Sequence, residues 1–139
     1  MTQKIRLLYF SRATRDMSLA DMKDILTAAR NNNSDLGICG MLCYNNRYFL
    51  QALEGDRKEV CELFIHIADD PRHDDLEILS FEYIEKPLFT DWKMGYASSS
   101  PLFDKLLAHM DLKEFLPEKI SPRHGLALLH NLSSHQEEV

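Results

Sequence analysis

One glutamine interrupts an apolar segment of the chain, and its amide is the first sign of a polar site. Gln51 lies within the run from Tyr48 to Leu53, where a buried strand normally carries hydrocarbon side chains. An unpaired buried amide costs about 1–3 kcal/mol, so we expect another polar group to face it. That group belongs either to the protein or to a bound molecule.

Strand periodicity suggests where this second polar group comes from. Side chains alternate between the two faces of a strand, so Gln51 shares a face with Phe49 and Leu53. Both faces of the run are apolar, which is typical of a central strand covered on both sides. In the first expected strand Tyr9 and Ser11 share a face. With a suitable register, these two hydroxyl groups lie on the same side of the sheet as Gln51.

The order of predicted elements indicates the fold that must position these residues. Ser18 with Asp21 is a variant capping box that opens a helix, and Asn31-Asn32-Asn33 is expected to end it. A second helix is expected from Asp56 to Asp70. Strands are expected at residues 5–10, 36–44, 48–54 and 76–84, with a fifth at 94–98. The order β-α-β-β-α-β is that of a ferredoxin-like α+β fold, an antiparallel sheet with two helices on one face.

Two further helices are expected at residues 102–110 and 122–132, the second opening at Ser121-Pro122. They are the simplest candidates to cover the other face of the sheet. We therefore expect a domain over residues 1–99 and a helical extension over residues 100–139. The extension packs on the sheet and ends in a frayed polar tail.

Composition excludes several classes of function. The chain has 139 residues and a formal net charge of −6, which does not suit a protein that binds nucleic acid directly. It contains no apolar run of membrane-spanning length and no signal peptide, so we expect a cytoplasmic protein without a membrane partner. Its three cysteines are interpreted as small core residues in a reducing compartment.

The expected register also predicts a site for a small molecule. Tyr9, Gln51 and the asparagine cluster would form a polar ring between the two helices. An apolar slot with a few convergent polar groups is the usual form of such a site. Its apolar lining is expected to include Ile25, Leu42 and Leu53.

Six motifs between residues 4 and 97 carry a family resemblance. They are Leu8-Tyr9-Phe10-Ser11, Asn32-Asn33, Gly37 to Tyr44, Phe49 to Gly55, Asp70-Pro71-Arg72-His73 and Trp92-Lys93-Met94. In their order and placement on the expected elements they resemble the BLUF domains, blue-light sensors that use flavin. Cys39 departs from the pattern, which has threonine or serine at this position.

The resemblance implies a non-covalently bound FAD, with its isoalloxazine ring between the two helices and against the sheet. It implies that Tyr9 gives up an electron and then a proton through Gln51, and that the changed glutamine shifts the flavin absorption to the red. Trp92 and Met94 would be the signalling pair, with Ser11 as an alternative partner of the Trp92 indole. Purely structural roles for Trp92 and Met94 as core residues stay open.

The resemblance also implies contacts to the rest of the cofactor. Asn32 and Asn33 would hold the pyrimidine edge of the flavin, where carboxamides match its donors and acceptors. Arg72 and His73 would contact the ribityl chain or the phosphates. The alternatives are that the asparagines only end a helix and that residues 70–73 are only a solvated turn.

These expectations describe a blue-light photoreceptor and not an enzyme. Its output would pass through contacts to a downstream protein partner, and we expect a homo-oligomer. The main alternative is a ligand-free ferredoxin-like interaction module. An acylphosphatase-like enzyme would need a glycine-containing phosphate loop, which the segment from Ser11 to Arg15 does not provide.

Overall fold

Five strands form one mixed sheet, which is the frame for the rest of the chain. The computed structural model describes residues 3–45, 47–90, 94–98 and 100–134, leaving aside the side chains of residues 32–35. Neighbouring strands run antiparallel, except for β2 and β5, which are parallel. Along the chain, the strands are β1 (Lys4–Ala13), β2 (Cys39–Tyr44), β3 (Tyr48–Asp56), β4 (His73–Tyr83) and β5 (Gly95–Ser98). Across the sheet, they lie in the order β4-β1-β3-β2-β5. The predicted ferredoxin-like order and the added fifth strand are confirmed.

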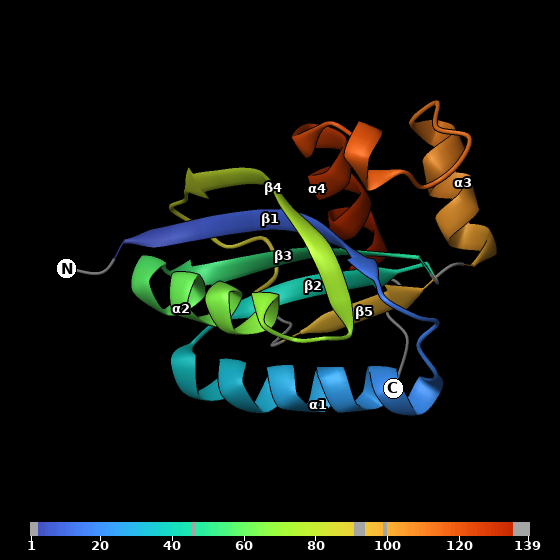
Figure 1. Cartoon of the computed structure of the whole chain (residues 1–139). Helices are drawn as coiled ribbons and strands as arrows, with labels where there is room; N and C mark the ends of the chain where they lie inside the picture. Colours follow the sequence, from blue (N-terminus) through green and yellow to red (C-terminus); the bar gives the residue numbers. More distant parts are fainter. Residues whose placement is uncertain (1–2, 46, 91–93, 99, 135–139) are drawn as a thin grey trace.

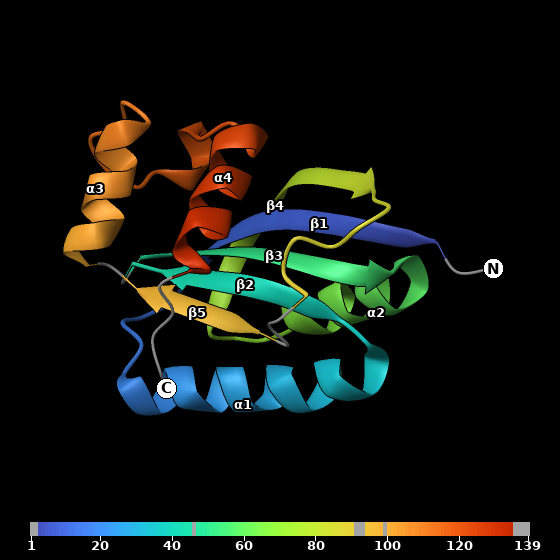
Figure 2. The same ribbon diagram turned by 180° about the vertical axis from the view of Figure 1, so that it is seen from behind.

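Helices cover both faces of the sheet (Figure 1). On one side lie α1 (Leu19–Leu36) and α2 (Arg57–Ala68). On the other side lie α3 (Pro101–His109) and α4 (Pro122–Leu132), with a short 3-10 turn, η1 (Pro117–Lys119), between them (Figure 2). Each side has its own apolar core, one beneath α1 and α2 and one beneath the C-terminal helices.

The central strand β3 divides its side chains between these two cores. Leu50 and Ala52 belong to the core beneath the C-terminal helices, while Phe49 and Leu53 belong to the core beneath α1 and α2. Gln51 therefore faces α1 and α2, as the alternation predicts. The pattern of apolar residues on both faces of this strand thus reflects two covering layers.

The observed helix ends differ from expectation at one place. The prediction that Asn31-Asn32-Asn33 ends the first helix is wrong, because α1 continues to Leu36. The end falls at Gly37, which has φ of 68°. Glycine adopts this left-handed conformation without the steric cost of a Cβ, so it ends helices more readily than asparagine.

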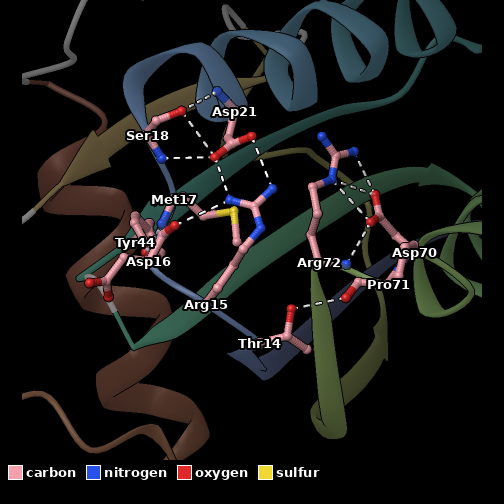
Figure 3. A network of polar contacts seen from close by, with 10 residues as sticks. All are labelled: Thr14, Arg15, Asp16, Met17, Ser18, Asp21, Tyr44, Asp70, Pro71 and Arg72. Atoms are coloured by element: carbon pink, nitrogen blue, oxygen red, sulfur yellow. Dashed lines mark hydrogen bonds and ion pairs between the residues drawn. The ribbon is translucent and has the colours of Figure 1, made fainter.

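The first turn of α1 confirms the predicted capping box. The backbone N–H of Asp21 donates to Ser18 Oγ at 3.1 Å, and that of Ser18 donates to Asp21 Oδ2 at 2.9 Å. Arg15 donates to the same carboxylate at 2.6 Å (Figure 3). These contacts fix the start of the helix that forms one wall of the site.

Across the described residues, every helix is too short or too polar to cross a membrane. Strand β4 starts at His73, three residues earlier than expected, so residues 69–72 form the turn after α2. The proposed division of the chain near residue 99 stays a prediction, since residue 99 lies outside the described part, as does the tail from residue 135.

Candidate functional site

Three buried side chains, two of them on paired strands of the sheet, meet beneath α1 and α2. Tyr9 on β1 is directly opposite Gln51 on β3. The Tyr9 hydroxyl donates to Gln51 Oε1, and Gln51 Nε2 donates to Met94 Sδ at 3.2 Å. The exposed fractions are only 2% for Tyr9, 5% for Gln51 and 2% for Met94. The register on which the predicted pairing depended is therefore confirmed.

The Gln51 amide retains unused hydrogen-bonding capacity. A glutamine side chain has two N–H donors and two carbonyl lone pairs. Tyr9 and Met94 use one of each, and the described residues supply no further partner for the other two. A buried amide with one donor and one acceptor left over among the described residues has the capacity to bind a ligand with matching polar atoms.

Gln51 and Tyr9 line a cavity of about 570 Å³. This volume is within the range of about 300–1,000 Å³ that is usual for small-molecule sites. Its walls come from α1, from the sheet and from the end of α2. The lining residues are Tyr9, Asp24, Ile25, Ala28, Ala29, Leu42, Phe49, Gln51, His66, Ile67, Asp69, Asp70, Pro71, Arg72 and His73.

Burial keeps the Tyr9 phenol neutral. Removal from water, and to a smaller extent the charge of Asp70, raises the pKa of Tyr9 far above its ordinary value of 10.0. The phenol is therefore protonated throughout the physiological pH range and can donate its hydrogen bond to Gln51. Its ring also packs edge-on against Phe64 of α2, with 5.0 Å between the ring centroids.

An ion pair lies in the turn that forms one end of the cavity. Arg72 donates to both carboxylate oxygens of Asp70, from Nε at 3.0 Å to Oδ1 and from one terminal nitrogen at 2.6 Å to Oδ2 (Figure 3). This hydrogen-bonded guanidinium lowers the pKa of Asp70. The Thr14 hydroxyl donates to Pro71 O at 2.9 Å and so ties the turn to the segment after β1.

His73 is held at both ring nitrogens. Its Nδ1 lies 2.7 Å from Ser11 Oγ, and its Nε2 lies 2.7 Å from Ile67 O. Because a carbonyl only accepts, Nε2 carries the proton and donates. His73 thus joins β1 to the end of α2, and its ring presents no free nitrogen to a ligand. Ser11 is fully buried in this contact.

Most of the predicted site residues converge on the cavity. Tyr9, Ile25, Leu42, Gln51, Arg72 and His73 all line it. Leu53 is fully buried in the neighbouring core and does not line it, and Met94 lies behind Gln51. Asn32 and Asn33 are on α1, but their side chains are outside the described part of the structure, as is all of Trp92. The roles assigned to these three residues stay predictions.

Several lining residues were not predicted as part of the site. Ala28 and Ala29 follow Ile25 at the three- and four-residue spacing of one helix face, and their small side chains leave room for a ligand. This spacing was available in the sequence. Asp69 gave no signal, because its place depends on how α2 ends.

A second buried polar cluster lies at the far end of β3. The fully buried Glu54 carboxylate accepts from Arg6 Nε at 2.7 Å and from the backbone N–H of Phe89 at 2.8 Å. It also accepts from the N–H of Leu88 at 2.9 Å. The Cys39 thiol donates to Glu54 at 3.6 Å, and burial together with this carboxylate raises the pKa of Cys39 to about 12. Glu54 thereby anchors the connection from β4 to β5.

Comparison with known proteins identifies the family of the chain. The family model described as "Sensors of blue-light using FAD" matches residues 5–95. The beta subunit of the photoactivated adenylate cyclase of Euglena longa is 35% identical over 97 residues, which are 69% of this chain and 11% of that protein. The chain therefore corresponds to a small part of that curated relative.

Solved structures resemble nearly the whole chain. BlsA in its photo-activated state has a TM-score of 0.90 and 31% identity, covering 98% of this chain and 99% of the other. BlrB, a BLUF protein in its dark state, has a TM-score of 0.81 and 32% identity, covering 96% and 98%. The predicted resemblance is confirmed: the chain belongs to the BLUF family, the sensors of blue light that use FAD.

Proposed function

We propose that this chain is a blue-light photoreceptor in which the cavity between α1 and α2 holds FAD. The observation that carries the proposal is the line from Tyr9 through Gln51 to Met94 at the floor of an apolar cavity. A cavity of about 570 Å³ lined by a partly unpaired amide is not expected of a ligand-free interaction module.

The residues of the cavity fit the cofactor of the family. A flat ring system needs apolar walls, which Ile25, Ala29 and Ile67 provide. Its polar edge needs donors and acceptors, and Gln51 retains one of each among the described contacts. Asn32 and Asn33 are proposed as the further carboxamides at this edge. At the other end, Arg72 still has N–H donors beyond those bound to Asp70, so it can contact a phosphate without breaking that pair.

The chain's own residues determine how the site responds to illumination. Bound FAD would supply a strong one-electron oxidant under blue light, and Tyr9 would be the electron donor. Loss of an electron makes the Tyr9 phenol strongly acidic, and Gln51 Oε1 already accepts its hydrogen bond. Gln51 could keep that proton only if one of its own N–H protons passed to the reduced cofactor, which would leave the imidic form; alternatively, the amide could rotate. When Tyr9 regains its electron and proton, no group has been consumed.

Either change alters the contact with Met94. A thioether sulfur accepts hydrogen bonds but cannot donate them. Rotation of the Gln51 amide would place its carbonyl oxygen against Met94 Sδ, and the present N–H to sulfur bond would be lost. Gln51 would then donate to Tyr9 instead of accepting from it. Met94 precedes β5, so a local change at Gln51 alters the contacts of an edge strand.

The output is proposed to pass to a protein partner by contact and not through catalysis by this domain. Support comes from relatives: a solved structure of a bacterial light-regulated adenylyl cyclase resembles 78% of this chain, and the resemblance covers only 33% of the cyclase chain. A homo-oligomer and a cytoplasmic location are part of the same proposal.

Absorption spectroscopy tests the proposal. Purified protein supplied with FAD should be yellow, its flavin bands should move to longer wavelength under blue light, and they should recover in the dark. Protein that takes up no FAD would contradict the proposed cofactor. Protein that binds FAD but shows no reversible red shift would contradict the photoreceptor function.

A further inference from the structure

Met94 is held by contacts from three different elements. Gln51 on β3 donates to its sulfur at 3.2 Å, and Arg30 on α1 donates from Nε to its backbone oxygen at 3.0 Å. Its terminal methyl packs over Gly40 on β2, where a Cβ would lie 3.2 Å from Met94 Cε. The position of the sulfur is therefore set by both ends of the residue.

The contact from Arg30 has a specific structural reason. The pairing of β5 with β2 begins at Gly95, so Met94 itself precedes the paired residues of the strand. A methionine side chain has three rotatable bonds, and its sulfur is a weak acceptor. The sulfur can face Gln51 reliably only if the backbone behind it is fixed. Arg30 supplies that fixation.

Arg30 also connects this contact to the wall of the cavity. It follows Ala28 and Ala29, which line the cavity on α1. The Arg30 side chain is partly buried and extends from α1 to the backbone of Met94, the residue whose sulfur binds Gln51. Two contacts thus orient the Gln51 amide: the Tyr9 hydroxyl requires an acceptor, and the Met94 sulfur requires a donor.

We propose that Arg30 is a positioning residue for the Gln51 amide. By holding the Met94 carbonyl, it places the sulfur where it accepts from Gln51 Nε2. This contact favours the orientation in which Oε1 faces Tyr9. Arg30 acts through Met94 and does not itself touch Gln51 in the described contacts. The inference rests on the proposed photoreceptor function and adds to it the residue that selects the dark orientation of the amide.

The first test uses NMR of the FAD-loaded protein in the dark. A nuclear Overhauser effect between the Gln51 side-chain amide and the Met94 methyl group should be present in the wild type and weakened at least severalfold in Arg30→Met. Lys23→Met removes a positive charge from an exposed position of the same helix and should leave the effect unchanged. A signal of wild-type strength in Arg30→Met would overturn the inference.

The second test uses dark recovery after illumination. Arg30→Met should recover about fivefold more slowly, which is the effect of one hydrogen bond of ~1 kcal/mol at 1.4 kcal/mol per factor of ten. The reason is that return of the amide requires the sulfur to be in place. In a Met94→Leu background this factor should disappear, because no sulfur remains to be positioned. Unchanged or faster recovery, or the same factor without Met94, would overturn the inference.

The two tests separate this inference from the proposed function. A wild type without a red shift would refute the photoreceptor function, while the nuclear Overhauser comparison would still decide the role of Arg30. If Arg30→Met does not fold, Arg30→Leu keeps part of the aliphatic stem and removes every side-chain N–H donor. It should show the same loss of the dark contact, and an undiminished contact would overturn the inference.

Discussion

The buried Glu54 carboxylate should contribute more to stability than any other single charge in the described part of the chain. It is fully buried and accepts from Arg6, whose side chain is 9% exposed, and from two backbone N–H groups of the β4–β5 connection. Replacing one partner of a buried ion pair leaves the other charge uncompensated, which costs about 3–5 kcal/mol. Glu54→Gln keeps one oxygen acceptor, and Glu82 still pairs with Arg6, so we expect a loss at the lower end of this range, ~3 kcal/mol.

Glu82→Gln is the matched control for this prediction. Glu82 binds the same arginine at 2.6 Å, but its side chain is 48% exposed. Exposed ion pairs contribute about 0–1 kcal/mol, so this variant should lose at most ~1 kcal/mol. For a domain of this size, ~3 kcal/mol corresponds to a decrease in Tm of roughly 10 °C.

Urea unfolding at pH 7, followed by far-ultraviolet circular dichroism, measures both variants. The Glu54→Gln transition should move to lower urea with an unchanged slope. Hydrogen exchange at the amides of Leu88 and Phe89 should accelerate in this variant and not in Glu82→Gln. Equal losses of unfolding free energy in the two variants would refute the assigned role of Glu54.

Three further predictions concern the cavity and its surroundings. Tyr9→Phe should retain FAD and lose the red shift, with a cost to stability of ~1 kcal/mol by denaturant unfolding, whereas Tyr83→Phe at an exposed position should keep the red shift. Ala29→Leu should fill part of the cavity and weaken FAD binding at least tenfold by titration, while the exposed Ala68→Leu should not. Asp70→Asn removes a carboxyl whose pKa is lowered by Arg72, so its stabilising effect is present above the ordinary value of 3.8 and is lost as pH falls below it. The difference in Tm between wild type and Asp70→Asn should therefore be small but constant near neutral pH and should vanish in acid; a difference that grows in acid would contradict this pairing.

The sequence predicted the sheet and the central pair because both depend on local patterns. Alternation along β3 placed Gln51 and Phe49 on one face, and the β-α-β-β-α-β order brought β1 beside β3. Tyr9 then met Gln51 because the two residues lie near the middle of paired antiparallel strands. Little more than periodicity was needed for this part of the site.

Other features depend on tertiary structure and could not be predicted from local patterns. Glu54 looked like the polar end of a strand, because nothing near it indicates that the chain returns to it at Leu88 and Phe89. His73 was interpreted as a ligand contact, yet Ser11 and Ile67 occupy both of its nitrogens. Such pairings become visible only when distant segments are placed together.

The light-minus-dark absorption difference of Gln51→Leu, compared with the wild type at equal FAD occupancy, tests the central claim most directly. Leucine has a similar volume but neither accepts from Tyr9 nor donates to Met94 or to a flavin. Gln51→Leu should therefore bind FAD nearly as well as the wild type and show no red-shifted bands under blue light. A normal red shift without the Gln51 amide would contradict the account.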